Sequence, residues 1–160
     1  MVGVGAIRFG MSRTAVHEAL GKPIRSFKKS PTSPHPTDSW HDSGFQVFYA
    51  GTDPLVNFIE LSGISGFEAV CFGHEVFSTP ASKLVDLFTV HAEYDAADPE
   101  LGYSYVFPSI ELALWRPVQE EPEGLYFSTI GIGVHGYFSA ASAVQLSVQP
   151  EVPEKLGHSG

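Results

Sequence analysis

The sequence predicts an α+β fold in which short helices pack on an antiparallel sheet. One short segment near the start carries helix signals at both ends, and most of the remaining chain alternates short apolar runs with glycine, proline and aspartate turns. The 12 Phe, six Tyr and two Trp residues suit pleated sheets. A length of 160 residues fits one ordinary domain, or two small repeats around a shared sheet.

The first helix is predicted after Ser12, whose side chain can cap the free amides of the first turn. Val16, Ala19 and Leu20 then make one narrow apolar face. Gly21 suits the left-handed position after a helix, and Pro23 prevents continuation. A helix of about two turns is unstable alone in water, so it must pack on the strands that follow.

The run Ile7–Pro23, with the pattern F-G-M-S-x-x-x-V-x-x-x-L-G-K-P, resembles the opening helix of the SmpA/OmlA (BamE-like) family of small outer-membrane lipoproteins. It is also similar to the repeat unit of the β-lactamase inhibitor protein. The resemblance implies a short helix lying on a small antiparallel sheet. It carries over no catalytic residue, and it favours an immunity-like or inhibitor-like protein.

Strands of the first half are predicted after a proline-rich loop at Ser30–Asp38, whose prolines exclude a helix and a central strand. Strands follow near Ser39–Asp42, at Gly44–Tyr49 and at Leu55–Leu61, with tight turns between them. Alternation places Phe45, Val47 and Tyr49 on one face. The segment Ser62–Gly66 is interpreted as the junction between two halves.

The second half is predicted to open with a buried strand at Phe67–Phe72. A second helix follows, with Thr79 as its cap and Pro80 at its first position. Its apolar face consists of Leu84, Leu87 and Phe88. Later strands are expected at residues 103–107, 109–115, 125–132 and 133–138, and the alternation of Val144, Leu146 and Val148 indicates a last short strand before a disordered tail at residues 150–160.

The two halves show signs of an internal repeat. Val16, Ala19 and Leu20 match Leu84, Leu87 and Phe88 at an offset of 68 residues, Ser39-Trp40 matches Ser104-Tyr105 at 65, and Phe58 matches Phe127 at 69. We therefore expect a first α-β repeat at residues 1–63, a second at 64–140 and a C-terminal segment at 141–160. The alternative is that two unrelated segments of this kind simply look alike.

The charge is divided unevenly between the halves. Residues 1–66 carry six Lys and Arg against five acidic residues, whereas residues 67–160 carry three against 13, within a net charge of −9. An acidic half argues against nucleic acid as a partner, because phosphates need cations. It fits an unknown, basic protein partner, and the alternative is that the acidity only aids solubility.

The compartment is predicted from cysteine usage and hydropathy. The single Cys71 excludes an internal disulfide, which favours a reducing compartment. The first residues lack a basic, apolar leader, and no window is apolar over the roughly 18–20 residues that a membrane span needs. The prediction is a cytoplasmic protein without membrane contact.

The sequence contains no specific catalytic or metal-binding motif. Cys71 and His74 do not make a site by themselves, and none of the seven His residues are spaced as H-x-x-x-H. The glycine-rich run at residues 131–136 lacks the Lys-Ser/Thr of a phosphate loop, and the acidic loops lack the calcium-binding pattern. We therefore predict no cofactor, no metal and no enzymatic activity.

The predicted function is a non-enzymatic protein-binding module that uses an aromatic sheet face and acidic loops. Phe48 and Trp115 should point away from the helices, and Trp40, Tyr103 and Tyr105 lie on adjacent strands. The residues expected to steer a basic partner are Glu93, Asp95, Glu120 and Glu121.

Two alternatives remain at this point. The aromatic face could be covered by the other half or by the C-terminal segment. The chain could instead be a small-ligand-binding or enzymatic domain, with a pocket between sheet and helices lined in its minimal form by His41, Asp42 and His135.

Overall fold

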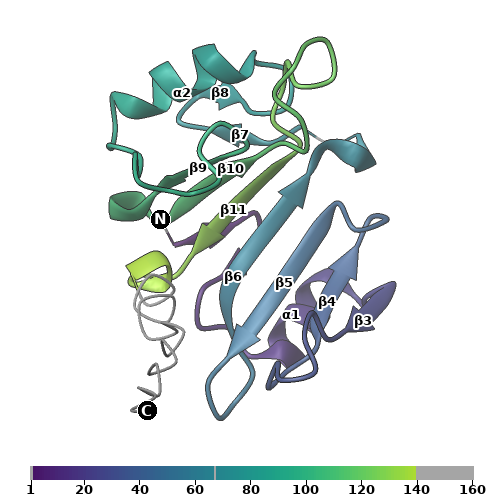
Figure 1. Cartoon of the computed structure of the whole chain (residues 1–160). Coiled ribbons are helices and arrows are strands. Elements are labelled where there is room, and N and C mark those ends of the chain that lie inside the picture. Colours follow the sequence, from purple (N-terminus) through teal and green to yellow (C-terminus); the bar gives the residue numbers. More distant parts are fainter. Residues whose placement is uncertain (1, 67, 140–160) are drawn as a thin grey trace, which may run out of the picture.

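The fold is a seven-stranded antiparallel sheet with helices on one side, seen in a computed structural model that describes residues 2–66 and 68–139 (Figure 1). This confirms the predicted α+β class. In spatial order the strands are β3 (Arg25–Phe27), β4 (Thr37–Trp40), β5 (Phe45–Ala50), β6 (Leu55–Ser62), β11 (Thr129–Gly133), β10 (Leu112–Trp115) and β9 (Ser104–Phe107).

Both helices, α1 (Arg13–Leu20) and α2 (Ala81–Thr89), pack on the same face of the sheet. One row of paired residues runs across this face from Asp38 through Val47, Ile59, Ile132 and Leu112 to Phe107. Asp38 bonds to side chains of α1, and the Phe107 ring contacts Phe88 of α2. Because paired residues share a face, the two helices form one layer over one core.

Two small hairpins and two 3₁₀ segments complete the described elements. The hairpins are β1 (Gly3–Val4) with β2 (Ile7–Arg8), and β7 (Val70–Cys71) with β8 (His74–Glu75). The 3₁₀ segments are η1 (Gly63–Ser65) and η2 (Pro108–Ile110). Each hairpin immediately precedes a helix, so a hairpin and a helix form the second layer of each half.

The first helix is built as its sequence predicts, with one exception. The Ser12 side chain accepts a hydrogen bond from the Ala15 amide at 3.2 Å, and Gly21 follows the helix at φ 78°. Val16 is fully buried, but Ala19 is exposed, so the predicted apolar face is narrower than expected.

The second helix is more deeply packed and begins differently from the prediction. Ala81, Leu84, Val85 and Phe88 are buried, which adds two residues to the predicted face. Pro80 itself holds the cap position, and no side chain caps the helix, so the predicted role of Thr79 is wrong. Packing rather than capping therefore stabilises α2.

The order of elements repeats: each half contains a hairpin, a helix and a run of antiparallel strands, which are β3–β6 in the first half and β9–β11 in the second. The pairing register is preserved between halves, since Asp38 pairs with Val47 while Tyr105 pairs with Leu114, at a common offset of 67. The same offset relates the Val4–Ile7 pair to the Cys71–His74 pair. The two halves meet where β6 pairs with β11.

Some strand predictions need correction. β4 begins at Thr37, inside the predicted proline-rich loop, and β3 was not predicted at all. Of residues 125–138, only Thr129–Gly133 is strand; residues 134–136 form a turn, and residues 137–139 are helical. The predicted strand at residues 144–148 and the tail lie outside the described residues. Within the described ranges, no helix is long and apolar enough to cross a membrane.

The two outer strands of the sheet are treated differently. The outer side of β9 is occupied by the loop before it, because the Asp95 amide donates to the Val106 carbonyl at 2.8 Å and the Ser104 amide donates to the Glu100 carbonyl. β3 is the other end of the sheet (Figure 1), and the exposed cations Arg25, Lys28 and Lys29 lie on or next to it.

Candidate interaction surface

Two of the predicted surface aromatics lie on the helix side of the sheet. Trp40 and Tyr105 belong to the paired row that contains Leu61 and Ile130, which are both buried in the core. Trp40 is only 5% exposed, and its indole N–H donates to the Gly21 carbonyl at 3.2 Å. The prediction that these two residues lie on the helix-free face is therefore wrong.

Phe48 and Trp115 do lie on the helix-free face, but they do not form one cluster. They are separated by three strand spacings and about four residues along the strands, which amounts to roughly 20 Å. Phe48 contacts the Phe58 ring at 5.4 Å, and the Tyr137 ring stacks on the other side of Phe58 at 4.5 Å. The centre of this face is thus partly covered by the described turn after β11.

A second group of aromatics gathers where β9 and β10 meet the acidic loop at residues 117–124. Trp115 is 42% exposed, and Tyr103 and Tyr126 are each 40% exposed. The Arg116 amide donates to the Tyr103 carbonyl at 2.9 Å, and the Ser128 amide donates to the Trp115 carbonyl at 2.8 Å. Backbone hydrogen bonds thus hold the three segments that carry these aromatics next to one another.

Arg116 fixes this region in place from the helix side of the sheet. Its Nε donates to the Gly102 carbonyl at 2.9 Å, and its Nη1 donates to the Gly124 carbonyl. Its guanidinium group lies over the Phe127 ring at 5.6 Å. These contacts tie the loop before β9 and the end of the acidic loop to the same side chain.

The acidic loop is closed on itself and on its neighbour. The Gly124 amide donates to the Glu120 carbonyl at 2.7 Å. The Gln119 side chain lies directly against Gly102, whose φ of 99° favours glycine. A loop held in this way loses little conformational freedom when a partner binds.

The charge of the acidic loop is uncompensated within the loop. Glu120, Glu121 and Glu123 are exposed, and residues 117–124 contain no Lys or Arg. We call the resulting surface the acidic–aromatic patch, and define it as Tyr103, Trp115, Glu120, Glu121, Glu123 and Tyr126.

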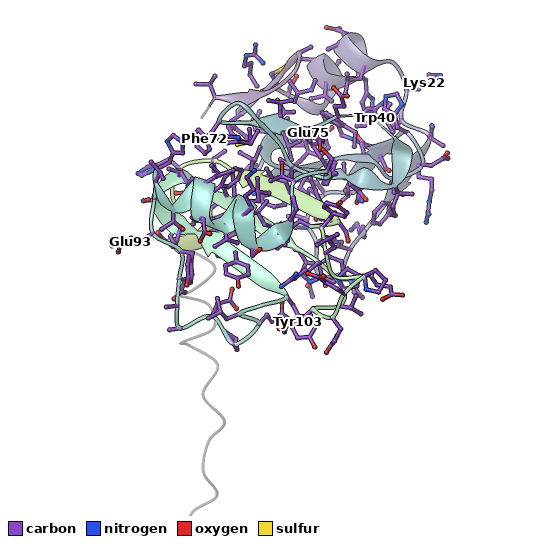
Figure 2. The ribbon with its side chains drawn as sticks, turned by 90° about the horizontal axis from the view of Figure 1, so that it is seen from above. Lys22, Trp40, Phe72, Glu75, Glu93 and Tyr103 are labelled. Carbon is purple, nitrogen blue, oxygen red and sulfur yellow. The ribbon has the colours of Figure 1, made fainter. Side chains whose placement is uncertain are left out.

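The other predicted acidic residues do not belong to the patch. Glu93 and Asp95 lie in the loop along the outer edge of β9. Figure 2 shows Glu93 and Tyr103 at separate places on the periphery, and both lie far from Trp40. The Asp95 side chain accepts a hydrogen bond from the Ala97 amide at 2.9 Å, so it shapes its own loop. Tyr126 was missed by the sequence analysis, although it directly precedes the buried Phe127.

A buried polar cluster in the first half was also missed. The Asp38 side chain is fully buried and receives a paired contact from Arg13, with Nε to Oδ2 and Nη2 to Oδ1 both at 2.7 Å. The side chains of His17, Ser26 and Tyr49 reach the same carboxylate at 2.6, 2.6 and 3.1 Å. We call these five residues the Asp38 cluster.

Electrostatics keep this carboxylate charged. Burial by itself raises the pKa of Asp38, but the hydrogen bonds from Arg13, Ser26 and His17 outweigh it and hold the pKa at about 2. Burial, together with the neighbouring Asp38 charge, raises the pKa of Tyr49, so its hydroxyl stays protonated and donates. The contacts of Asp38 are made with side chains of the protein itself. Two of these side chains, Arg13 and His17, belong to α1, so the cluster fastens α1 to the sheet.

The pocket predicted from His41, Asp42 and His135 is not formed. His41 and Asp42 lie in the turn whose Gly44 carbonyl accepts from the Ser62 amide, at one end of β6. His135 lies near the other end of β6, because the amide of the preceding Val134 donates to the Asn57 carbonyl. The Nδ1 atom of His135 is 3.7 Å from the Glu111 carboxylate. Among the described residues, no group of three or more His, Cys, Asp or Glu could hold a metal ion.

Space is instead found on the helix side, between the two hairpins and the sheet. One cavity of about 320 Å³ lies against Leu61, Ile130 and Cys71, and burial raises the pKa of that thiol to about 11. A neighbouring cleft of about 530 Å³ shares Leu61 with it and extends toward His41.

No protein-family model, curated protein sequence or solved structure matches this chain.

Proposed function

We propose that this chain is a non-enzymatic protein-binding module that engages a basic partner through the acidic–aromatic patch. The observation that supports the proposal is that three exposed aromatic residues and three exposed glutamates are carried by adjoining segments, which backbone hydrogen bonds and Arg116 hold together. Exposed Trp and Tyr side chains supply much of the affinity in protein interfaces. The carboxylates would speed encounter with a positively charged surface.

The geometry favours association over catalysis in one further respect. The most strongly bonded ionisable group, Asp38, is fully buried and engaged by side chains of its own fold. The exposed patch, in contrast, offers contact area and charge. An immunity-like or inhibitor-like role, as the resemblance of Ile7–Pro23 implies, requires such a surface and no reactive group.

The test compares four immobilised baits in the native lysate at low and high salt. The baits are the wild type, Trp115→Ala, the triple variant Glu120→Gln/Glu121→Gln/Glu123→Gln, and a charge-matched control. The control is Glu18→Gln/Asp42→Asn/Asp53→Asn, which removes three exposed acidic residues from the first half. Circular dichroism on each variant confirms that it is folded.

We expect a basic protein to be retained at low salt by the wild type and by the control, and to be lost from both patch variants. Measured with that purified protein, Trp115→Ala should weaken binding at least tenfold, and the triple Gln variant should mainly reduce the association rate and its salt dependence. Equal retention by the patch variants and the control, or the lack of any salt-sensitive partner, would refute the proposal.

A further inference from the structure

The cavity between the two hairpins, which we call the junction cavity, is a separate feature from the acidic–aromatic patch. Its floor is formed by Leu61 of β6 together with Ile130 and Ile132 of β11. These three side chains belong to the helix-facing rows of the sheet, so the cavity lies on the side opposite to Trp115. It occupies the line where the two halves join.

The walls of the junction cavity come from the hairpins of both halves. Val4 lies in β1, Cys71 lies in β7, and Val76 directly follows β8. Two residues of its lining, Val70 at 66% and Phe72 at 38%, are exposed and form an apolar rim. None of the described residues that line the cavity carries an acidic or basic side chain.

Size and chemistry together define what this cavity can hold. Its volume is about 320 Å³. An apolar cavity of about 150 Å³ in another protein stays dry and binds benzene, which sets the scale for this one. A charged ligand would lose its hydration here without gaining a partner charge.

The hairpins also offer a route of entry. Each hairpin stands outside the seven-stranded sheet and consists of two residue pairs extended by one further backbone hydrogen bond, from Phe9 to Val2 and from Val76 to Ala69. The cavity is open to solvent where Val70 and Phe72 are exposed, so a small molecule can enter at this rim without displacing the core.

We infer that the junction cavity is a binding site for a small, uncharged, apolar molecule of about the size of indole. Cys71 is the single cysteine of the chain and lines this cavity, so it reports on occupancy without any added label. The probe molecule is indole, and the thiol reagent is methyl methanethiosulfonate, which is small and neutral. Indole-3-acetate serves as the charged counterpart of indole.

We expect indole to slow the modification of Cys71 at least tenfold in a saturable manner, and indole-3-acetate to leave the rate unchanged. Ala69→Leu adds a side chain to the cavity lining and should weaken indole binding at least tenfold by calorimetry. The matched control Ala97→Leu, on an exposed loop, should bind as the wild type does. Cys71→Ser should still bind indole, since the thiol is a reporter and not the binding group.

Several results would overturn the inference. These are a modification rate that does not respond to indole up to its solubility limit, equal protection by indole-3-acetate, or undiminished binding by Ala69→Leu. If Ala69→Leu does not fold, Val4→Phe takes its place in the same comparison, because Val4 is half-buried and also lines the cavity. Loss of the partner of the acidic–aromatic patch would not affect these measurements.

Discussion

The two halves of this molecule share a topology but fasten their helices by different physics. At matching positions, Arg13 and His17 of α1 correspond to Ala81 and Val85 of α2. Asp38 corresponds to Tyr105. The first helix is therefore held by a charged cluster with one fully buried apolar residue, and the second by four buried residues.

The difference shows that a helix at the same place in the fold can be stabilised either by a charged cluster whose hydrogen bonds are satisfied or by apolar packing. A buried carboxylate is unfavourable unless its hydrogen bonds are satisfied, and Asp38 has the contacts it needs. An apolar interface depends on complementary shape and on buried area, so α2 is held in place although no side chain caps it at Pro80. The following predictions test how far the two solutions differ.

The largest effect is expected in the apolar half. Phe88→Ala should lower the free energy of unfolding by about 4 kcal/mol, because it removes a fully buried ring that contacts Phe107. Urea denaturation measures this loss. Val90→Ala, at an exposed position after the same helix, should change the value by less than about 0.5 kcal/mol. A similar loss in both variants would contradict the apolar account of α2.

The second-largest loss of stability is expected in the polar half, from the substitution Asp38→Ala. Removing this carboxylate leaves Arg13 and His17 without their partner, and should cost about 3 kcal/mol in urea denaturation. Asp53→Ala, at an exposed position in the turn after β5, is the matched control and should be close to neutral. If Asp38→Ala costs less than about 1 kcal/mol, the cluster does not hold α1.

Acid should loosen the first half before the second. Because the pKa of Asp38 is lowered from 3.8 to about 2, its stabilisation is complete above about pH 4 and is lost as the pH falls through 2. The shift corresponds to about 2 kcal/mol. Amide hydrogen exchange between pH 4 and pH 2 should therefore show α1 losing protection ahead of α2.

The variant Asp38→Asn serves as the control for this titration. It lacks the titrating group, so the difference in amide protection between α1 and α2 should no longer depend on pH between pH 4 and pH 2. Parallel loss of protection in both helices of the wild type would contradict the assignment of the effect to Asp38.

The smallest effect concerns the helix caps. Ser12→Ala removes the hydrogen bond to the Ala15 amide and should cost about 1 kcal/mol in thermal or urea unfolding. Ser82→Ala, near the start of the uncapped α2, should be neutral or slightly stabilising, because alanine has the higher helix propensity. An equal loss of stability in the two variants would contradict the conclusion that a side chain caps α1 but not α2.

The sequence predicted those features that depend on neighbouring residues. Ser12 and Gly21 mark the ends of α1 because caps act within one turn, and the alternation around Phe45 and Val47 gave the correct faces of β5. Alternation does not say which face the helices cover across a whole sheet. This is why Trp40 and Tyr105 were placed on the wrong side.

The candidate surface could be predicted only in part, for a similar reason. Trp115, Tyr103, Glu120 and Glu121 were named, but their meeting depends on Arg116 reaching backbone carbonyls at Gly102 and Gly124. In the Asp38 cluster, Arg13 and Asp38 are 25 positions apart, and the five members come from a helix and three strands. No local pattern reports such contacts, and Asp38 itself was hidden at the end of a proline-rich loop.

Within residues 2–66 and 68–139, no strand pairs with the outer edge of β3, and this bears on how the protein behaves at high concentration. An unpaired strand edge is a template for adding strands from other molecules, and charged side chains are a common protection against this. Here the exposed cations Arg25 and Lys28 lie on or next to β3 and can provide that protection, while the opposite edge is covered by its own loop. Replacing Arg25 and Lys28 by threonine should therefore promote edge-to-edge association into β-rich aggregates.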